Sequence, residues 1–271
     1  MIFHYLKIAF RNLCKHKTQN IISIIGLAVG LLCFCVCIYC SRFVESTDHC
    51  FANHDRIAEL NLYDGKADRY FSGSPVPLAE ELRTWALGET EAISSVTYPR
   101  ERPYYVELSP EKTLPYELET IEIDTCYNKI FTPEMVAGHW KMASQSLNSV
   151  ILSQSMAIKI FGNAESAIGK HMTLMRRLNT SPESTPKTGG IVYIIQAVMK
   201  DIPLNNSLDF MQNIDMLTVN DSEGLLQSPK RHNMTGANTY VLLSPQTTCT
   251  DLEKQFSKRD YTYTCLLYTS P

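Results

Sequence analysis

The chain has 271 residues, of which 44% are hydrophobic and 10% aromatic, and it contains 9 cysteines. This composition excludes a disordered, collagen-like or disulfide-scaffold protein and leaves room for one large domain or two small ones. The net charge of −3 combines +4 in residues 1–20, which hold no acidic residue, with −7 in the remainder. Such an uneven charge distribution indicates a membrane protein rather than a nucleic-acid binder.

Residues 21–40 form an uncharged apolar run, IISIIGLAVGLLCFCVCIYC. At about 1.5 Å per residue a helix of this length crosses the roughly 30 Å hydrocarbon core, so we predict one transmembrane helix over residues 21–42. A cleaved signal peptide is the alternative, but its apolar stretch is shorter, about 7–15 residues, and ends in small residues. Because the basic residues precede the span and the acids Glu45 and Asp48 follow it, the positive-inside rule places the N-terminus in the cytoplasm.

Residues 1–20 are predicted to form a cytoplasmic amphipathic helix in the headgroup layer. Apolar residues recur at helical spacing, and Lys7, Arg11 and Lys15 form a basic stripe on the opposite face. The alternative is an ordinary basic flank that orients the span. Within the span, Gly26 and Gly30 form a GxxxG motif, which lets a second membrane helix approach closely.

The cysteines divide into two groups. The four in the span are interpreted as small apolar residues rather than metal ligands, because residues two apart on a helix point in different directions; Cys14 precedes the span on the cytoplasmic side. The extracytoplasmic cysteines show no C-x-x-C spacing, which neither requires nor excludes disulfides; they are Cys50, Cys126, Cys249 and Cys265.

Residues 43–257 are predicted to form an α+β periplasmic domain. The expected helices cover 77–87, 154–161 and 251–256, with Ser74 and Thr250 as candidate caps and Gly162 as a stop signal. The expected strands cover 94–99, 104–108, 118–124, 149–152, 170–174, 191–199, 215–219 and 239–243. The turn-rich stretch 178–190 is expected to be an exposed loop.

One set of residues resembles a catalytic motif. Ser109-x-x-Lys112, Ser146-x-Asn148 and Lys187-Thr188-Gly189 occur in the order that penicillin-recognising enzymes use. That chemistry requires the serine at the start of a buried helix, with the lysine one turn later as its base. Pro115 and the strand-like YYVEL before Ser109 argue against such a helix, so we predict no catalytic residue and no enzymatic activity.

No cofactor or metal residue is predicted either. Residues 162–170 imitate a phosphate-binding loop, but the glycines are too far apart and His171 occupies the position of the Ser or Thr that must hold magnesium. The densest group of candidate metal ligands, Asp48-His49-Cys50 with His54-Asp55, lacks a spacing that gathers three donors, and we expect a solvated polar segment there.

Six segments in order resemble a known family. They are KIAFRNL at 7–13, NHDRIAELN at 53–61, SPVPLAEELR at 74–83, SVILSQSMAIKIFGNAESAIGKHM at 149–172, IVYIIQAVMKDIPLNNSLDF at 191–210, and TYVLL followed by DLEKQF towards the end. Together with the single span they resemble the N-terminal half of MacB/FtsX-type ABC-transporter permeases, over residues 1 to about 257.

The resemblance implies a cytoplasmic elbow helix, a first span, a periplasmic core domain of two α+β lobes, and three later spans that this chain lacks. It implies a truncated permease subunit in the bacterial inner membrane, acting as a dimer with a separate cytoplasmic ABC ATPase and with a periplasmic or outer-membrane partner. The periplasmic domain would relay ATPase-driven motion to a substrate or partner. The alternative is a stand-alone membrane-anchored binding module. Residues 258–271 resemble translated adapter sequence and are expected to be a non-native tail, with a short strand as the alternative.

Overall fold

The computed structural model describes residues 4–5, 11, 15, 17–64, 69–71, 73–109, 112–146, 148–174, 190–208, 213–219, 235–258 and 263–267. They divide into two compact units, Met1–Ser46 and Thr47–Pro271. Most of the predicted amphipathic helix, including Lys7, and the predicted loop 178–190, apart from Gly190, lie outside the described residues.

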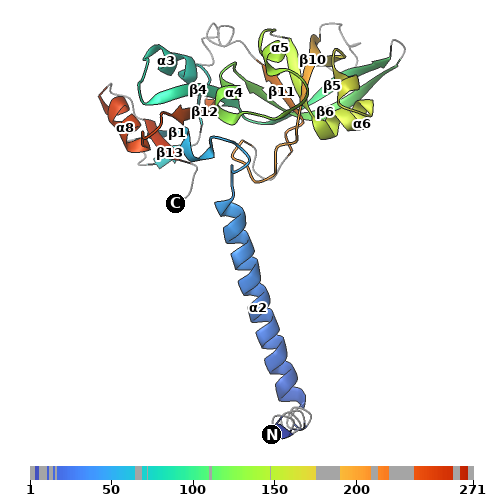
Figure 1. Cartoon of the computed structure of the whole chain (residues 1–271), viewed down its shortest axis with the longest axis vertical. Coiled ribbons are helices and arrows are strands. Elements are labelled where there is room, and N and C mark those ends of the chain that lie inside the picture. Colours follow the sequence, from blue (N-terminus) through green and yellow to red (C-terminus); the bar gives the residue numbers. More distant parts are fainter. Residues whose placement is uncertain are drawn as a thin grey trace, which may run out of the picture. The chain divides into compact units, whose positions relative to one another are not determined.

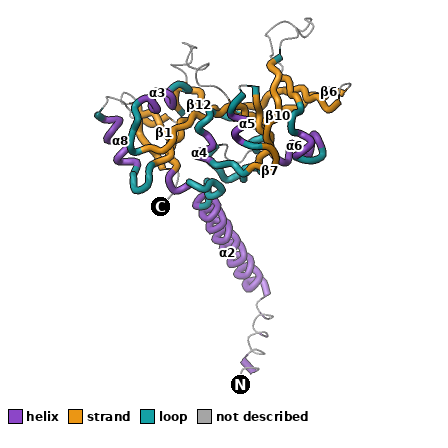
Figure 2. Tube along the Cα trace, turned by 45° about the horizontal axis from the view of Figure 1, so that its top comes forward, coloured by secondary structure: helices purple, strands orange, loops and turns teal. Residues whose placement is uncertain are grey.

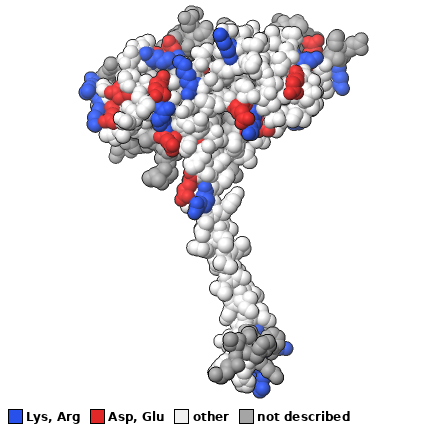
Figure 3. Space-filling view, viewed as in Figure 1, with Lys and Arg blue, Asp and Glu red and all other residues white. Residues whose placement is uncertain are grey.

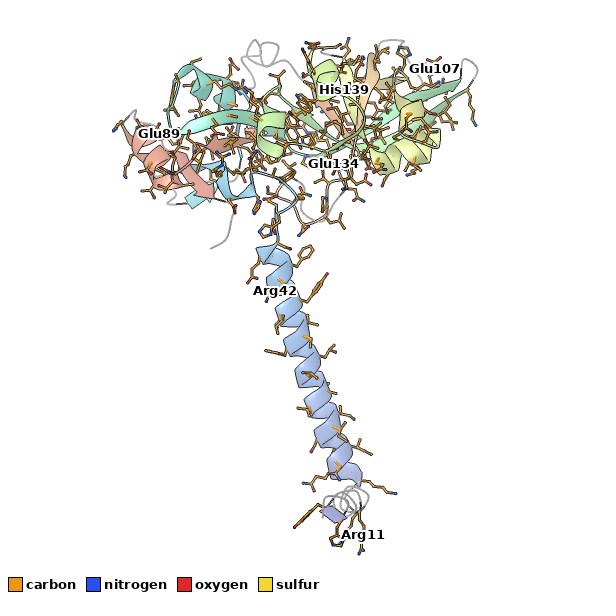
Figure 4. All side chains as sticks on the ribbon, viewed as in Figure 1. Arg11, Arg42, Glu89, Glu107, Glu134 and His139 are labelled. Atoms are coloured by element: carbon orange, nitrogen blue, oxygen red, sulfur yellow. The ribbon has the colours of Figure 1, made fainter. Side chains whose placement is uncertain are left out.

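The first unit is built on one long helix, α2 (Lys17–Glu45). It encloses the predicted span, its most apolar window has a mean hydropathy of 2.9, and none of its residues is buried within the protein. Its 29 residues extend about 44 Å, enough to cross a bilayer core. Charged side chains are confined to its ends (Figure 3), and Figure 4 marks Arg11 before the apolar stretch and Arg42 after it.

The second unit is a mixed α/β structure around one extended sheet (Figure 1). The strands are β1 (Ile57–Asp64), β2 (Arg69–Phe71), β3 (Ser74–Pro75), β4 (Thr90–Thr97), β5 (Arg100–Ser109), β6 (Lys112–Ile123), β7 (Met135–Gly138), β8 (Ser149–Ser153), β9 (His171–Leu174), β10 (Ile191–Met199), β11 (Met216–Val219), β12 (Thr235–Leu243) and β13 (Tyr263–Leu267). The helices are η1 (His54–Arg56), α3 (Leu78–Thr84), α4 (Tyr127–Phe131), α5 (Trp140–Ser144), α6 (Gln154–Phe161), η2 (Glu165–Ala167) and α8 (Cys249–Ser257).

The strand order is β11-β8-β10-β9-β5-β6-β4-β12-β1-β13, with β2, β3 and β7 pairing beside this path. Strand β11 also pairs with β6, so that β6, β11, β8, β10, β9 and β5 form a closed ring. All six strands contribute side chains to one apolar cluster, together with α6. The ring therefore has an interior filled by side chains, as small barrels do.

The rest of the sheet is covered by helices on both faces. Alternate residues of β12 point to opposite sides, Tyr240 and Leu242 toward a core with α4, and Val241 and Leu243 toward a core with α3 and α8. Burial on both faces explains why the end of β12 is continuously apolar rather than alternating. Figure 2 shows α3 and α8 near the β1–β12 end of the sheet and α6 near the other end.

All eight predicted strands are found, and α6 has the predicted bounds because its signals are local. Ser153 Oγ accepts a hydrogen bond from the Met156 amide (3.4 Å), and Gly162 ends the helix with φ +87°. Two predicted caps are wrong. Ser74 lies in β3 with its hydroxyl 2.6 Å from that of Thr239, and α8 is capped by Thr248, which forms a capping box with Asp251.

The structure also contains elements that local signals did not indicate, among them β1, β7, α4 and α5. The predicted division into two lobes is not confirmed, since the described strands pair in one sheet. In the predicted tail, β13 pairs antiparallel with β1, from Ala58 opposite Leu267 to Leu62 opposite Tyr263. This arrangement matches the alternative of a short strand, while the non-native origin of residues 258–271 stays a prediction.

Candidate functional site

Residues 47–56, here called the link segment, lie between the end of α2 at Glu45 and the start of β1 at Ile57. It belongs to the second unit. Over ten residues it makes contacts with α4, β12 and loop 203–208, which follows β10. These contacts hold the link segment against the rest of the second unit.

Asp48 ties the link segment to loop 203–208. Its amide donates to the carbonyl oxygen of Asn205 (3.1 Å), and its Oδ1 accepts from the Ser207 amide (2.8 Å). The residue is 2% exposed and has φ +64°, a conformation that Asp tolerates better than most residues. Burial raises the pKa of this carboxyl, and the bonds from Ser207 partly offset the effect. The expected solvated polar segment is therefore wrong for Asp48.

Phe51 provides the apolar contact. Its ring lies edge-on to that of Phe131 in α4, with centroids 4.9 Å apart, and Phe131 lies edge-on to Tyr240 of β12 at 5.0 Å. Tyr240 in turn donates its hydroxyl to the carbonyl oxygen of Ser207 (3.3 Å). Asp48, through Ser207, and Phe51, through Phe131, are thus both linked to Tyr240 of β12.

Two further side chains complete the attachment. Asn53 Nδ2 donates to the carbonyl oxygens of Lys129 (3.2 Å) and Ile130 (3.3 Å), in the last turn of α4, where helical carbonyls lack partners within the helix. Arg56 donates to the carbonyl oxygen of Leu243 (2.8 Å) and pairs with Glu91 at 2.9 Å. The link segment is therefore fixed at intervals of two to three residues.

A pocket of about 490 Å³ opens beside the link segment. Residues 49–52 and 54, 131–134 and 200–203 line it, so that three separate segments contribute to its wall. The wall includes the ring pair His49 and His54, with centroids 4.5 Å apart, and the ion pair of Lys200 with Glu134 at 3.1 Å. Figure 4 labels Glu134 at this pocket.

Asp124, between β6 and α4, is the most fully partnered buried acid. Its carboxylate accepts from Ser94 Oγ (2.7 Å), the Ser95 amide (2.9 Å) and the Cys126 amide (3.0 Å), and it pairs with Arg83 of α3. Burial raises the pKa of Asp124, and the charge of Arg83 opposes that rise. With every partner supplied by the protein, this group joins α3, β4 and α4 and has a structural role.

Ser109 and Lys112 are not placed as the penicillin-recognising pattern requires. Ser109 is the last residue of β5 and Lys112 is the first of β6, paired across an antiparallel hairpin rather than placed one turn apart on a helix. Ser146 lies in the turn before β8, and Lys187–Gly189 lie outside the described residues.

The other predicted residues are placed as follows. Gly26 and Gly30 lie within α2, and an added Cβ at either would meet no atom within 4 Å. Arg11 and Lys15 are helical and exposed. Cys50 and Cys126 are free thiols, and Cys249 is half-buried. Across the described parts of the chain, no three His, Cys, Asp or Glu side chains are arranged to hold a metal ion.

Comparison of the sequence with protein-family models and with curated proteins finds no match. Solved structures do match. A domain of a protein described as a permease from Porphyromonas gingivalis has a TM-score of 0.60 at 21% identity, covering 82% of this chain and 95% of that domain. The periplasmic region of MacB from Actinobacillus actinomycetemcomitans has a TM-score of 0.51 at 13% identity, covering 81% of this chain and 91% of that region.

A third match, the extracellular domain of the ABC-type transporter YknZ from Gram-positive bacteria, has a TM-score of 0.47 at 13% identity, too low to add to the argument. It covers 78% of this chain and 99% of that domain. The fold of the second unit is thus that of a MacB-like periplasmic domain. The resemblance seen in the sequence is confirmed at the level of the fold.

Sequence reasoning did not find the link contacts. Its resemblance motif at 53–61 began at Asn53, yet nothing local in Asn53 or Arg56 indicates that their partners are the carbonyl oxygens of α4 and β12. The nearest signal was the position of the segment, a short polar stretch between a predicted span and the first domain residues.

Proposed function

We propose that the chain is the N-terminal part of a permease subunit in an ATP-driven ABC transporter or mechanotransmission complex. Its periplasmic unit relays ATPase-driven motion to a substrate or a partner. The observation that carries the proposal is the link segment, which follows an apolar helix of membrane-crossing length in the chain and is fixed within a MacB-like domain by repeated side-chain contacts. The structural matches to permease domains support the same role.

The physical argument concerns stiffness. A Gly- or Ser-rich linker behaves as a flexible coil and would absorb a displacement of the helix end. The link segment instead has a buried acid at Asp48, a buried ring at Phe51 and side-chain bonds at Asn53 and Arg56. A push or rotation at its start is therefore transmitted to α4 and β12, at the centre of the unit.

The orientation that we infer places the N-terminus in the cytoplasm and residues 43–257 in the periplasm, with the apolar stretch of α2 in the bacterial inner membrane. The four basic residues and no acids in residues 1–20 support it. Lys7, Arg11 and Lys15 would face anionic headgroups, and Gly26 and Gly30 would allow a second helix to approach. The partners we propose are a separate cytoplasmic ABC ATPase, a second permease subunit and a periplasmic or outer-membrane protein.

The test uses the permease encoded by the complete gene, reconstituted in lipid nanodiscs with the ATPase encoded beside it. Spin labels replace Glu107, a half-exposed residue near the tip of the β5–β6 hairpin (Figure 4), in each copy of the dimer. We expect the distance between the labels to differ between the ATP-bound and ADP-bound states.

The matched variant carries Asp48→Ala and Asn53→Ala, which remove two attachments of the link segment. It should hydrolyse ATP at the normal rate while the label distance no longer changes. A distance that does not respond to nucleotide in the unmodified protein contradicts the relay. A chain that purifies from its own membranes without any ATPase favours the stand-alone binding module.

A further inference from the structure

The pocket beside the link segment has the dimensions of a small-molecule site. Its volume of about 490 Å³ falls within the range of roughly 300–1,000 Å³ typical of ligand pockets. Part of its wall is apolar and rigid, since Phe51, Phe131 and Ile202 are each at least nine-tenths buried and belong to the central core. A preformed apolar wall of this kind binds a flat apolar body without first rearranging.

The polar groups of the wall differ in whether they are already engaged. Asp201 accepts from the amide (3.0 Å) and hydroxyl of Ser155, and Glu134 pairs with Lys200. Both acids are therefore occupied by donors from the protein itself. Lys200 is engaged by Glu134 in turn, and the imidazole N–H of His49 can donate to a ligand that accepts hydrogen bonds.

The histidines supply an aromatic surface and a donor. The ring of His54 is held by the carbonyl oxygen of Phe51 (3.1 Å) and by Asp55 (3.2 Å), and the ring of His49 lies against it. His49 is exposed, and within the described chain its ring forms no hydrogen bond. An aromatic ligand can stack on such rings, and the His49 N–H can donate to an acidic group on that ligand.

We propose that this pocket binds a planar aromatic small molecule carrying a carboxylate or a similar acidic group. The aromatic body would lie against the apolar wall and the histidine rings, and the acidic group would accept from His49. Such a ligand contacts the link segment, the end of α4 and the residues after β10 together, so that its binding holds the link segment in place. The binding itself does not depend on the proposed transport role.

Cys50 lies on the pocket wall and is exposed, so it reports occupancy directly. Partial burial of its thiol raises its pKa to about 11, which slows alkylation. The experiment uses the full chain in nanodiscs with Cys50 as the single cysteine, treated with N-ethylmaleimide in the presence of 2-naphthoate. The matched control retains only Cys249, which is half-buried in α8 and does not line the pocket.

A ligand of this size reaches a Kd of about 1 mM at an ordinary binding energy per atom. About 5 mM 2-naphthoate should then slow alkylation of Cys50 about six-fold and leave Cys249 unchanged. His49→Leu should raise the half-protecting concentration about ten-fold, because a hydrogen bond to a charged acceptor is lost. Ala52→Trp, which fills the pocket, should make the Cys50 rate insensitive to 2-naphthoate.

The proposal is overturned if 2-naphthoate leaves the Cys50 rate unchanged, or if it slows Cys249 equally, which indicates partition into the membrane. It is also overturned if His49→Leu leaves protection unaltered, or if the neutral analogue 2-naphthamide protects as well as the acid does. These outcomes are independent of ATP hydrolysis, so failure here is distinguishable from failure of the relay.

Discussion

Phe51 of the link segment and Tyr240 of β12 lie edge-on against the same ring, that of Phe131, with centroids 4.9 and 5.0 Å from it. Edge-to-face pairs stabilise beyond their area burial, by roughly 0.5–1.5 kcal/mol each. The second contact between these regions runs through Ser207, which Asp48 and Tyr240 both hold. The polar and aromatic contacts therefore support each other, and loss of one should weaken the other.

We expect Phe51→Ala to lower the free energy of unfolding of the second unit by about 3 kcal/mol, since a buried ring leaves a cavity. Urea unfolding of the full chain, followed by tryptophan fluorescence, measures it, because Trp140 stacks on Tyr127 beside Phe131. Tyr105→Ala is the control, since this aromatic residue is 37% exposed and its loss should cost about 1 kcal/mol or less. Equal costs for the two variants would show that the link segment is not part of the core.

The pH dependence of stability should differ in sign between two acids. Burial raises the folded pKa of Asp48 above its ordinary 3.8, so the folded state binds the proton more tightly. The contribution of Asp48 to the free energy of unfolding is most favourable at low pH and is lost as the pH rises through the folded pKa. The unfolding free energy of the unmodified chain minus that of Asp48→Asn should therefore increase as the pH falls from 7 to about 4.

Asp251 is the opposite case and serves as the control. Hydrogen bonds from Thr248 and Lys254 lower its pKa to about 2, so its contribution is present above the ordinary 3.8 and is lost as pH falls toward 2. The unfolding free energy of the unmodified chain minus that of Asp251→Asn should therefore decrease as the pH falls. Slopes of the same sign in the two variants would contradict the assignment for Asp48.

Removal of Arg83 should leave the buried Asp124 carboxylate without its counter-charge. We expect Arg83→Met to cost about 2 kcal/mol, less than a fully buried pair because the Arg83 side chain is 23% exposed. Adding Asp124→Asn to it should recover part of that loss. Lys200→Met, which breaks an exposed ion pair with Glu134, should cost about 0–1 kcal/mol in the same unfolding assay. A double variant no more stable than Arg83→Met would show that the loss does not come from the unpaired carboxylate.

Cysteine labelling in intact cells tests the inferred orientation. A variant retaining only Cys50, exposed in the second unit, should react with a membrane-impermeant thiol reagent, whereas one retaining only Cys14 should react after the cells are broken open. Cys50 is more exposed than Cys126, but its raised pKa slows its reaction, so the labelling time is set by the rate at which Cys50 reacts in broken cells. Labelling of Cys14 in intact cells, with Cys50 protected, would reverse the topology.

A fluorescent penicillin should acylate neither the unmodified chain nor Ser109→Ala. In the structure Ser109 and Lys112 belong to two paired strands, so the lysine is not presented to the serine along a helix. Penicillin-binding proteins in the same membranes show that the reagent is active. Covalent labelling that disappears in Ser109→Ala would establish a nucleophile and overturn both the non-enzymatic role and the permease assignment.

The sequence by itself determined the features whose signals lie within a few residues. An uncharged apolar run specifies a helix of membrane-crossing length, Gly162 marks the end of α6, and short apolar runs locate eight strands. Each depends on hydropathy, capping or a positive φ, which act over one or two turns of chain. The order of six segments that resemble the family was enough to indicate the MacB-like fold.

Only the tertiary structure decided how the link segment is held. Asp48 meets Ser207 across 159 residues, and Arg56 meets Leu243 across 187, so neither partner can be read from local sequence. The closed ring likewise depends on the pairing of β11 with β6, strands whose hydropathy gives no information about their neighbours. Local periodicity states which face of a strand is buried, whereas the choice of partner follows from how the whole chain fills its core.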